Sequence, residues 1–331
     1  MSVLYITEDH AYITKSGATL YARLPDGQRR ALPLEQITDV VCYGDVSWSG
    51  AALRELAAGK VGIAFLDGLG RWLGRLEPPE SKAVFLRRAQ FRASDDPVRS
   101  TTIARVIVQG KVRNCRSLLQ RAQRDGMVEA AAEILELGDV LQRLISAQGV
   151  DRVRGLEGDA ARCYFGAYGR LVSGHGFVFA GRQRRPPPDP VNAMLSFGYA
   201  LLERTAAAAV RIVGFDAHVG FLHADRYGRE SLALDLMEEF RPLVVDSLVA
   251  ALVHRRVVGV GDFVWNPTEC RLSDAARRTF IQQLERKLVS EVHHPVLKQR
   301  VTHRRAMELQ ARILAKHLTG EIETYVSFSK R

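Results

Sequence analysis

A histidine and three carboxylates lie within one short stretch of the chain, GFLHADRYGRESLALDLMEEFRP. Asp235, Glu238 and Glu239 are three and four residues apart, so a helix through this stretch places all three on one side. Like charges at that spacing repel one another and need a cation, a proton or a basic partner nearby. His223 precedes them, and a turn that contains glycine allows it to fold back over the carboxylates. This stretch is the first candidate for a functional site.

Each member of the stretch also has an ordinary structural explanation. An acidic helix face is usually solvated surface, and a single histidine is more often a hydrogen-bonded core residue than a ligand. Pro242 weakens the first explanation, because a proline just beyond the acidic residues is expected to end the helix there. His218, in the same segment, is interpreted as structural.

The second candidate stretch is VRGLEGDAARCYFGAYGRLVSGHG, whose central acid is Glu157. Apolar residues at helical spacing form a stripe beside it: Leu156, Ala160, Cys163, Ala167 and Leu171. Glu157 is therefore expected on an adjacent, partly exposed face. Arg154 could pair with it across one helical turn, so a modest helix salt bridge is the structural alternative. Spacing alone does not decide between these two interpretations.

If Glu157, His223 and Glu238 converge, they offer two carboxylates and one imidazole to a metal ion. With water positions left open, this set suits Mg²⁺ or Mn²⁺, and zinc is the second choice. Such an ion could bind a phosphodiester oxygen and activate an attacking hydroxyl or water, as in nucleases and strand-transfer enzymes. The sequence has no G-x-x-x-x-G-K-[ST] phosphate loop and no G-x-S-x-G elbow, so ATP hydrolysis and serine esterase chemistry lose support.

The formal net charge of +10 favours a polyanionic partner, because basic side chains that neutralise phosphates release counterions on binding. A modest positive excess also occurs for solubility alone, and any one basic group is more often a solvated face. Repetition of such groups across the second half of the chain favours DNA. The residues expected to contact it are Arg184, Arg185, Lys298, Arg300, Arg304 and Arg305.

The order of the patterns predicts an α+β fold. Residues 1–76 alternate like short strands and form a small β-rich domain with one helix, SGAALRELAAG, between Ser49 and Gly59. Residues 77–83 include two prolines and are expected to be a linker. Residues 84–331 show helical spacing and form a larger α domain with the metal site. The four cysteines are widely separated and are expected to be reduced and buried.

Three segments resemble a known family, the CRISPR-associated spacer integrase and endonuclease that is the first-numbered of the Cas proteins. These segments are LEGDAARCYF, RRPPPDPVNAMLSFGYALL and GFLHADRYGRESLALDLMEEFRP, and they occur in that order. The β-rich start and KVRNCRSLLQR resemble the family as well, so the likeness covers nearly the whole chain. One departure is AHVGFLH, where a proline is expected near position 217 or 218; it lies outside the ligand set.

The resemblance implies an N-terminal domain that mediates dimerisation and an α domain with a Glu/His/acid metal site. Carried over by motif, the catalytic and metal-binding residues are Glu157, His223 and Glu238. Asp235 is implied as a supporting carboxylate. Asn192 and Arg241 are implied to lie near the site as polar and phosphate-facing groups.

The family's activity implies insertion of short double-stranded DNA fragments, the prespacers, next to a CRISPR repeat, with a 3′-hydroxyl as the nucleophile. It also implies a homodimer that joins a dimer of the small second-numbered Cas protein, in the cytoplasm of a prokaryote and associated with the nucleoid. Neither a membrane span nor a secretory signal is expected. Two alternatives stay open: a structure-specific endonuclease that cuts branched DNA with water, and a DNA-binding scaffold without catalysis.

Overall fold

The computed structural model describes residues 2–59, 61–67, 72–76, 83–183, 186–266 and 269–329. The chain divides into two compact units, Met1–Lys82 and Ala83–Arg331, which are described separately below. The first is rich in strands and the second in helices, and the α+β fold class predicted from the sequence is confirmed. The predicted linker lies outside the described residues apart from Ala83. Among the described residues, no helix is long and apolar enough to cross a membrane.

In its described part, the first unit consists of two four-stranded sheets and one α-helix. In one sheet the order is β1-β5-β7-β8, where β1, β5 and β7 run parallel and β8 is antiparallel to β7. In the other the order is β4-β3-β2-β6. The elements are β1 (Ser2–Ile6), β2 (Tyr12–Ser16), β3 (Thr19–Arg23), β4 (Arg29–Pro33), β5 (Ile37–Tyr43), β6 (Ser47–Trp48), α1 (Gly50–Ala58), β7 (Gly62–Leu66) and β8 (Trp72–Leu76).

Alternation along the strands builds the core of this unit. Ile13, Leu20, Val40 and Ile63 are fully buried and belong to one hydrophobic cluster, which α1 joins through Leu56. The sequence predicted α1 correctly at both ends. The side chain of its N-cap residue, a serine, accepts a hydrogen bond from the backbone N–H of the third residue of the helix, and a glycine follows its last turn.

The second unit is built from nine α-helices in its described part and two short hairpins. Its elements are α2 (Val84–Asp95), α3 (Pro97–Arg124), α4 (Ala131–Ile145), α5 (Val150–Val172), α6 (Pro190–Val213), α7 (Ser231–Glu238), α8 (Ser247–His254), β9 (Phe263–Asn266), β10 (Glu269–Leu272), α9 (Asp274–Val289), β11 (Glu291–His293), β12 (Arg300–Thr302) and α10 (His303–Leu318).

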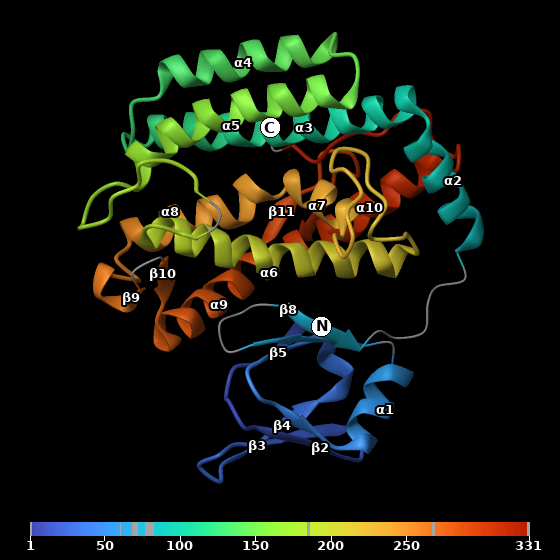
Figure 1. The fold of residues 1–331 in the computed structure, drawn as a ribbon, viewed down its shortest axis with the longest axis vertical. Coiled ribbons are helices and arrows are strands. Elements are labelled where there is room, and N and C mark those ends of the chain that lie inside the picture. The colour runs from blue at the N-terminus through green and yellow to red at the C-terminus, as the bar shows by residue number, and fades with distance from the viewer. Residues whose placement is uncertain are drawn as a thin grey trace. The chain divides into compact units, whose positions relative to one another are not determined.

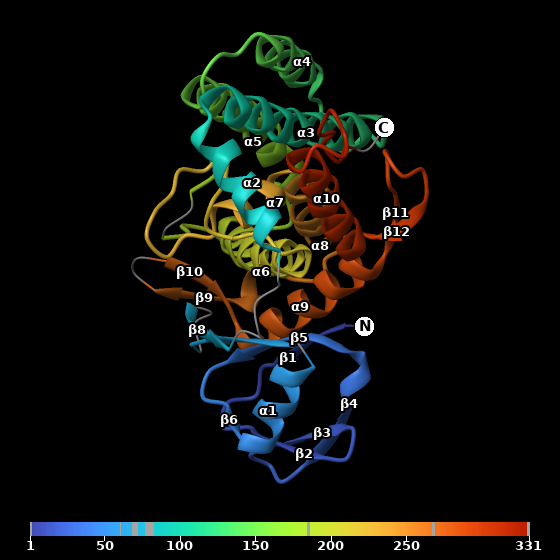
Figure 2. The same ribbon diagram turned by 90° about the vertical axis from the view of Figure 1, so that its right-hand side faces the viewer.

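Helices α3, α4 and α5 pack side by side, and α6, α7 and α10 form further contacts beneath them (Figure 1, Figure 2). Two of the longest helices begin in the same way. Asp96 caps α3 and Asp189 caps α6, and each is followed by a proline at the first helical position, where no N–H is needed. These caps fix where the two helices begin.

The segment after α7 differs from the sequence-based expectation. As expected, α7 ends before Pro242, at Glu238, but residues Pro242–Asp246 then form a π-helix that leads directly into α8. Pro242 is the first residue of this π-helix, where the missing N–H of proline leaves no hydrogen bond within the helix unmade. The whole stretch from α7 to α8 is buried at nearly every residue, so it forms part of the core of this unit.

Candidate active site

Asp235 on α7 holds the loop that carries His223. Its buried carboxylate accepts hydrogen bonds from the backbone N–H groups of Phe221, Leu222 and His223, at 2.6, 2.9 and 2.9 Å. Gly220 permits this approach, because a Cβ there would lie 2.8 Å from Asp235 Oδ2. One carboxylate thus satisfies three consecutive donors of a loop that has no regular structure of its own.

The same carboxylate orients the imidazole of His223. Nδ1 of His223 lies 2.7 Å from Asp235 Oδ1. A carboxylate can only accept, so the neutral ring carries its proton on Nδ1 and presents the lone pair of Nε2. Nε2 lies 3.9 Å from Glu238 Oε1, one helical turn farther along α7. A carboxylate behind a histidine is the usual arrangement around metal-binding imidazoles.

Glu157 and Glu238 meet across a lysine. Lys111 on α3 donates a hydrogen bond to Glu157 Oε1, and its Nζ lies 2.6 Å from Glu238 Oε2. Lys111 and Glu238 are buried, whereas the Glu157 side chain is 23% exposed, as the sequence predicted. Burial alone would lower the pKa of Lys111, but the carboxylates of Glu157 and Glu238 raise it, so the ammonium stays charged.

Arg241 completes the surroundings of Glu238. Its Nη1 donates to Glu238 Oε1 at 2.6 Å, and its guanidinium lies over the ring of Tyr199, 3.9 Å from the centroid. Burial would raise the pKa of Glu238, but Arg241 and Lys111 hold it well below its ordinary range. Glu238 is therefore an anion with a separate cation at each oxygen.

Glu157, His223 and Glu238 line one cavity of about 270 Å³. Three arginines also line it: Arg154, Arg226 and Arg229. The alternative helix salt bridge between Arg154 and Glu157 is absent. Arg154 donates to the carbonyl of Leu222 at 2.6 Å and to Asp151 at 2.8 Å. The cavity combines a possible cation site with groups that attract phosphate.

The fold and this geometry can be compared with known proteins. The family model described as "CRISPR associated protein Cas1" matches residues 4–286. This chain belongs to the Cas1 family. A curated relative, CRISPR-associated endonuclease Cas1 2 of Rhodospirillum rubrum, is 40% identical over 98% of this chain and 97% of its own length.

Two solved structures are also similar to this Cas1-family chain. A casposase bound to integration product has a TM-score of 0.88 at 26% identity, over 100% of this chain and 94% of the other. A Cas1 protein from Thermotoga maritima has a TM-score of 0.84 at 26% identity, over 100% of both chains. The likeness thus extends over both units of the fold.

The donor set of this Cas1-family site fits a divalent cation by type and by its shared cavity. Two carboxylates and an oriented imidazole, open to solvent on the cavity side, suit Mg²⁺ or Mn²⁺. In the described part of the chain, however, no three His, Cys, Asp or Glu side chains are already grouped as a metal ion needs. The cation that contacts both carboxylates in this structure is Lys111.

Two residues expected at the site serve other purposes. Glu239 faces away from the cavity: Tyr325 Oη and the N–H of Phe328 donate to its carboxylate, each at 2.6 Å. Glu239 therefore does not join Asp235 and Glu238, which both lie beside His223. Asn192 is fully buried at the start of α6, where it accepts from Arg182 and donates to Asp189 and to Gly181. It organises the loop before α6 and does not line the cavity of Glu157, His223 and Glu238.

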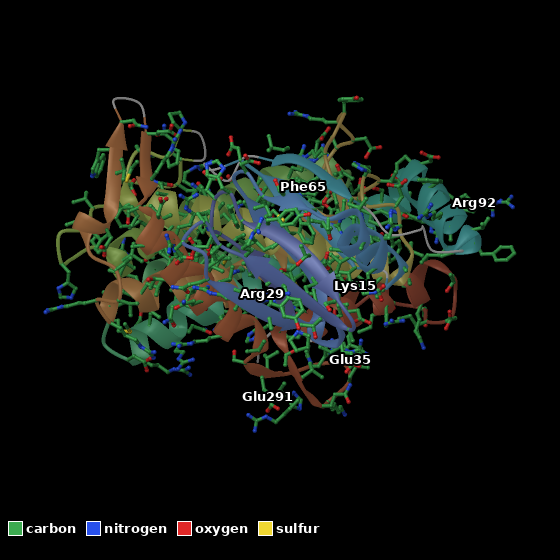
Figure 3. The ribbon with its side chains drawn as sticks, turned by 90° about the horizontal axis from the view of Figure 1, so that it is seen from below. Lys15, Arg29, Glu35, Phe65, Arg92 and Glu291 are labelled. Atoms are coloured by element: carbon green, nitrogen blue, oxygen red, sulfur yellow. The ribbon has the colours of Figure 1, made fainter. Side chains whose placement is uncertain are left out.

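The predicted DNA-binding residues have different surroundings. Arg184 and Arg185 lie outside the described residues. Lys298 and Arg305 are exposed, and exposed Arg300 pairs with Glu291 at 3.1 Å. Arg304 is instead largely buried and donates to both oxygens of Glu285 at 2.8 Å, so its charge is already neutralised. Arg92 on α2 extends away from the helix (Figure 3).

Sequence reasoning missed Lys111. It occurs in KVRNCRSLLQR, on a helix whose burial pattern continues through this position. A lysine among core-facing residues of a long helix was the available signal, because buried lysines are rare unless they are paired.

Proposed function

We propose that the chain is a metal-dependent DNA integrase and endonuclease that inserts short DNA fragments into a CRISPR array. The observation that carries the proposal is the single cavity lined by Glu157, His223 and Glu238 in a Cas1-family fold. Its support from relatives is twofold: the curated relative is named an endonuclease, and the casposase was solved bound to an integration product.

Glu157, Glu238 and Nε2 of His223 would hold the divalent ion. When bound, such an ion neutralises charge on the scissile phosphate and activates the attacking hydroxyl. Asp235 holds Nδ1 and so directs Nε2 of the imidazole into the cavity. The three arginines of the cavity orient the phosphates on either side.

The side chains around the cavity support direct transesterification. None of the described residues that line it carries a hydroxyl or a thiol. The imidazole and the two carboxylates that could act as nucleophiles there are the proposed metal ligands. The 3′-hydroxyl of the incoming DNA is therefore the proposed nucleophile. We further propose that the chain acts as a homodimer through its strand-rich unit, together with the small second-numbered Cas protein.

Strand transfer of a short labelled duplex into supercoiled plasmid tests the proposal. The assay uses Mn²⁺ or Mg²⁺, with and without the small Cas partner, and compares the wild type with His223→Ala. His218→Ala is the matched control, because His218 is exposed on the same segment and its Nδ1 contacts the carbonyl of Arg229 instead of the cavity. Joining that needs metal and is lost only in His223→Ala is the expected result.

Two other results would change the assignment. Cleavage without joining, also lost in His223→Ala, would favour an endonuclease that acts on branched DNA with water as nucleophile. Binding of DNA with neither cleavage nor joining under any metal would leave a DNA-binding scaffold. Circular dichroism of each variant separates loss of activity from loss of folding.

A further inference from the structure

Lys111 occupies a position that the proposed metal chemistry does not explain. It projects from α3 and joins a carboxylate of α5 to a carboxylate of α7, and these are two of the three proposed metal ligands. A buried ammonium in such a place has a large desolvation cost, which only close anionic partners offset. Its position therefore indicates a specific role at the site.

The contacts divide the oxygens of Glu238 between two cations. Arg241 takes Oε1, which also lies nearest to His223 Nε2, and Lys111 takes Oε2. Glu157 is bound to Lys111 through Oε1. Without the ammonium of Lys111, the carboxylates of Glu157 and Glu238 would have less positive charge between them and would repel each other. The ammonium is thus the group that holds Glu157 beside Glu238 when no divalent ion is present.

The structure also offers Lys111 a place to withdraw. Lys111 and Glu157 both border a second cavity of about 470 Å³, which Tyr199, Arg182 and Asp246 also line. Among the described residues, Lys111 does not line the cavity that contains His223 and Glu238. The lysine therefore approaches the carboxylates from the second cavity and not from the cavity of His223. Its flexible four-carbon stem allows the ammonium to retreat toward the second cavity.

We propose that Lys111 is an internal cation that keeps the ligand carboxylates together in the metal-free protein and is displaced toward the second cavity when a divalent ion binds. The inference rests on the proposed metal site. It makes Lys111 a positioning residue with two opposite effects. The lysine stabilises the metal-free fold, and it weakens metal binding because the ion must first displace it.

Mn²⁺ titration of the full chain by isothermal calorimetry, with thermal unfolding in EDTA and in saturating Mn²⁺, tests this inference. Lys111→Met is expected to bind Mn²⁺ about tenfold or more tightly than the wild type. Its Tm in EDTA should fall, and the rise in Tm on adding Mn²⁺ should exceed that of the wild type. Lys15→Met removes a lysine paired with Glu55 in the strand-rich unit (Figure 3) and should bind Mn²⁺ like the wild type.

Two further variants separate the possible failures. If Glu157→Gln and His223→Ala bind Mn²⁺ as well as the wild type, the proposed metal site is wrong. If both weaken binding but Lys111→Met binds Mn²⁺ equally well or less well than the wild type, only the inference about Lys111 is wrong. Lys111→Gln, which removes the charge but keeps a hydrogen-bond donor, serves if Lys111→Met does not fold in EDTA. If Mn²⁺ restores the fold of Lys111→Met or Lys111→Gln, the inference is supported. If neither variant folds in Mn²⁺, the inference is wrong.

Discussion

Asp235 directs the functional loop without lining the cavity itself. Its carboxylate receives three backbone N–H groups and Nδ1 of His223, and it is completely buried. Because each of these donors belongs to the loop before α7, the loop has one preferred arrangement against the helix. The position of Nε2 is thus decided by a residue that the sequence identified only as a supporting acid.

We predict that Asp235→Asn weakens both the fold and the site. An amide cannot accept all four hydrogen bonds, and unsatisfied buried donors should reduce the free energy of unfolding by about 2 to 3 kcal/mol. Loss of the partner behind a metal-binding histidine should lower Mn²⁺ affinity by about 10- to 100-fold. Urea unfolding and Mn²⁺ titration measure the two effects. Asp225→Asn, at an exposed position of the same loop, should change neither, and equal behaviour of both variants would contradict the prediction.

A second prediction concerns Asp246, at the end of the π-helix. Tyr164 and Tyr199 each donate a hydrogen bond to its carboxyl oxygens. Burial nevertheless raises its pKa from 3.8 to about 6. The folded chain thus holds this proton more tightly than the unfolded chain, so the stabilising contribution is complete below pH 3.8 and is lost as the pH rises through about 6.

Asp246→Asn should therefore flatten the dependence of unfolding free energy on pH. A difference of about two pKa units corresponds to a change of roughly 3 kcal/mol in the free energy of unfolding. This change occurs between about pH 4 and pH 6. Urea unfolding at unit pH intervals from 4 to 7 measures the slope for the wild type and the variant. Parallel profiles of the two proteins over that interval would show that Asp246 does not titrate as described.

At the scale of elements, the C-terminal tail supports α7 from the side away from the cavity. Tyr325 and Phe328 bind Glu239, and Asn114 of α3 donates to the carbonyls of Glu239 and Phe328 at 2.7 and 2.8 Å. Burial raises the pKa of Glu239 to about 8. In both views the last described residues lie beside α3 (Figure 1, Figure 2). The tail and α3 together hold the helix that carries Glu238.

Gly110 makes this contact between α3 and the tail possible. A Cβ at Gly110 would lie 2.6 Å from the Cβ of Ser327. We predict that Gly110→Ala displaces the tail and costs about 1 to 3 kcal/mol, in spite of the better helix propensity of alanine. Gly155→Ala on α5 is the matched control, since a Cβ there meets nothing within 4 Å and should stabilise the helix by up to about 1 kcal/mol. Urea unfolding measures whether the two substitutions change the free energy of unfolding in opposite directions. If both variants are more stable than the wild type, the packing argument is wrong.

At the scale of the whole molecule, the net charge of +10 suits a polyanionic partner, but the structure does not make all basic residues equivalent. Arg304 is neutralised by Glu285 inside the fold, whereas Lys298 is exposed on the turn of the β11–β12 hairpin. A cation that already has a buried partner releases no counterion from DNA.

We therefore predict different salt effects for the two residues. In fluorescence anisotropy with a labelled duplex, Lys298→Ala should reduce the slope of log K against log [salt] by about 0.9. Arg304→Ala should leave that slope unchanged and should instead reduce stability, because it leaves Glu285 largely buried without its partner. A change of slope in Arg304→Ala alone would reverse the assignment of DNA contacts.

Local patterns in the sequence predicted those features that depend on neighbouring residues. The α+β fold class, the caps of α1, the helical course of α3 and the partial exposure of Glu157 all follow from period, turn residues and capping chemistry, which act over a few residues. His223 and Glu238 belong to one short stretch, so their joint appearance at a site could be expected from spacing. The assignment of Glu157 as a metal ligand depended on the resemblance to a family, because spacing did not distinguish it from a helix salt bridge.

The tertiary structure alone decided which group each charge meets. Lys111 is separated from Glu157 by 46 residues, and Glu239 from Phe328 by 89, so no local pattern could pair them. Asn192 has nearer partners, because Arg182, Gly181 and Asp189 all lie within 11 residues of it along the chain. Burial makes an unpaired charge costly, and its partner is chosen by the packing of α3, α5 and α7, which exists only in the folded chain.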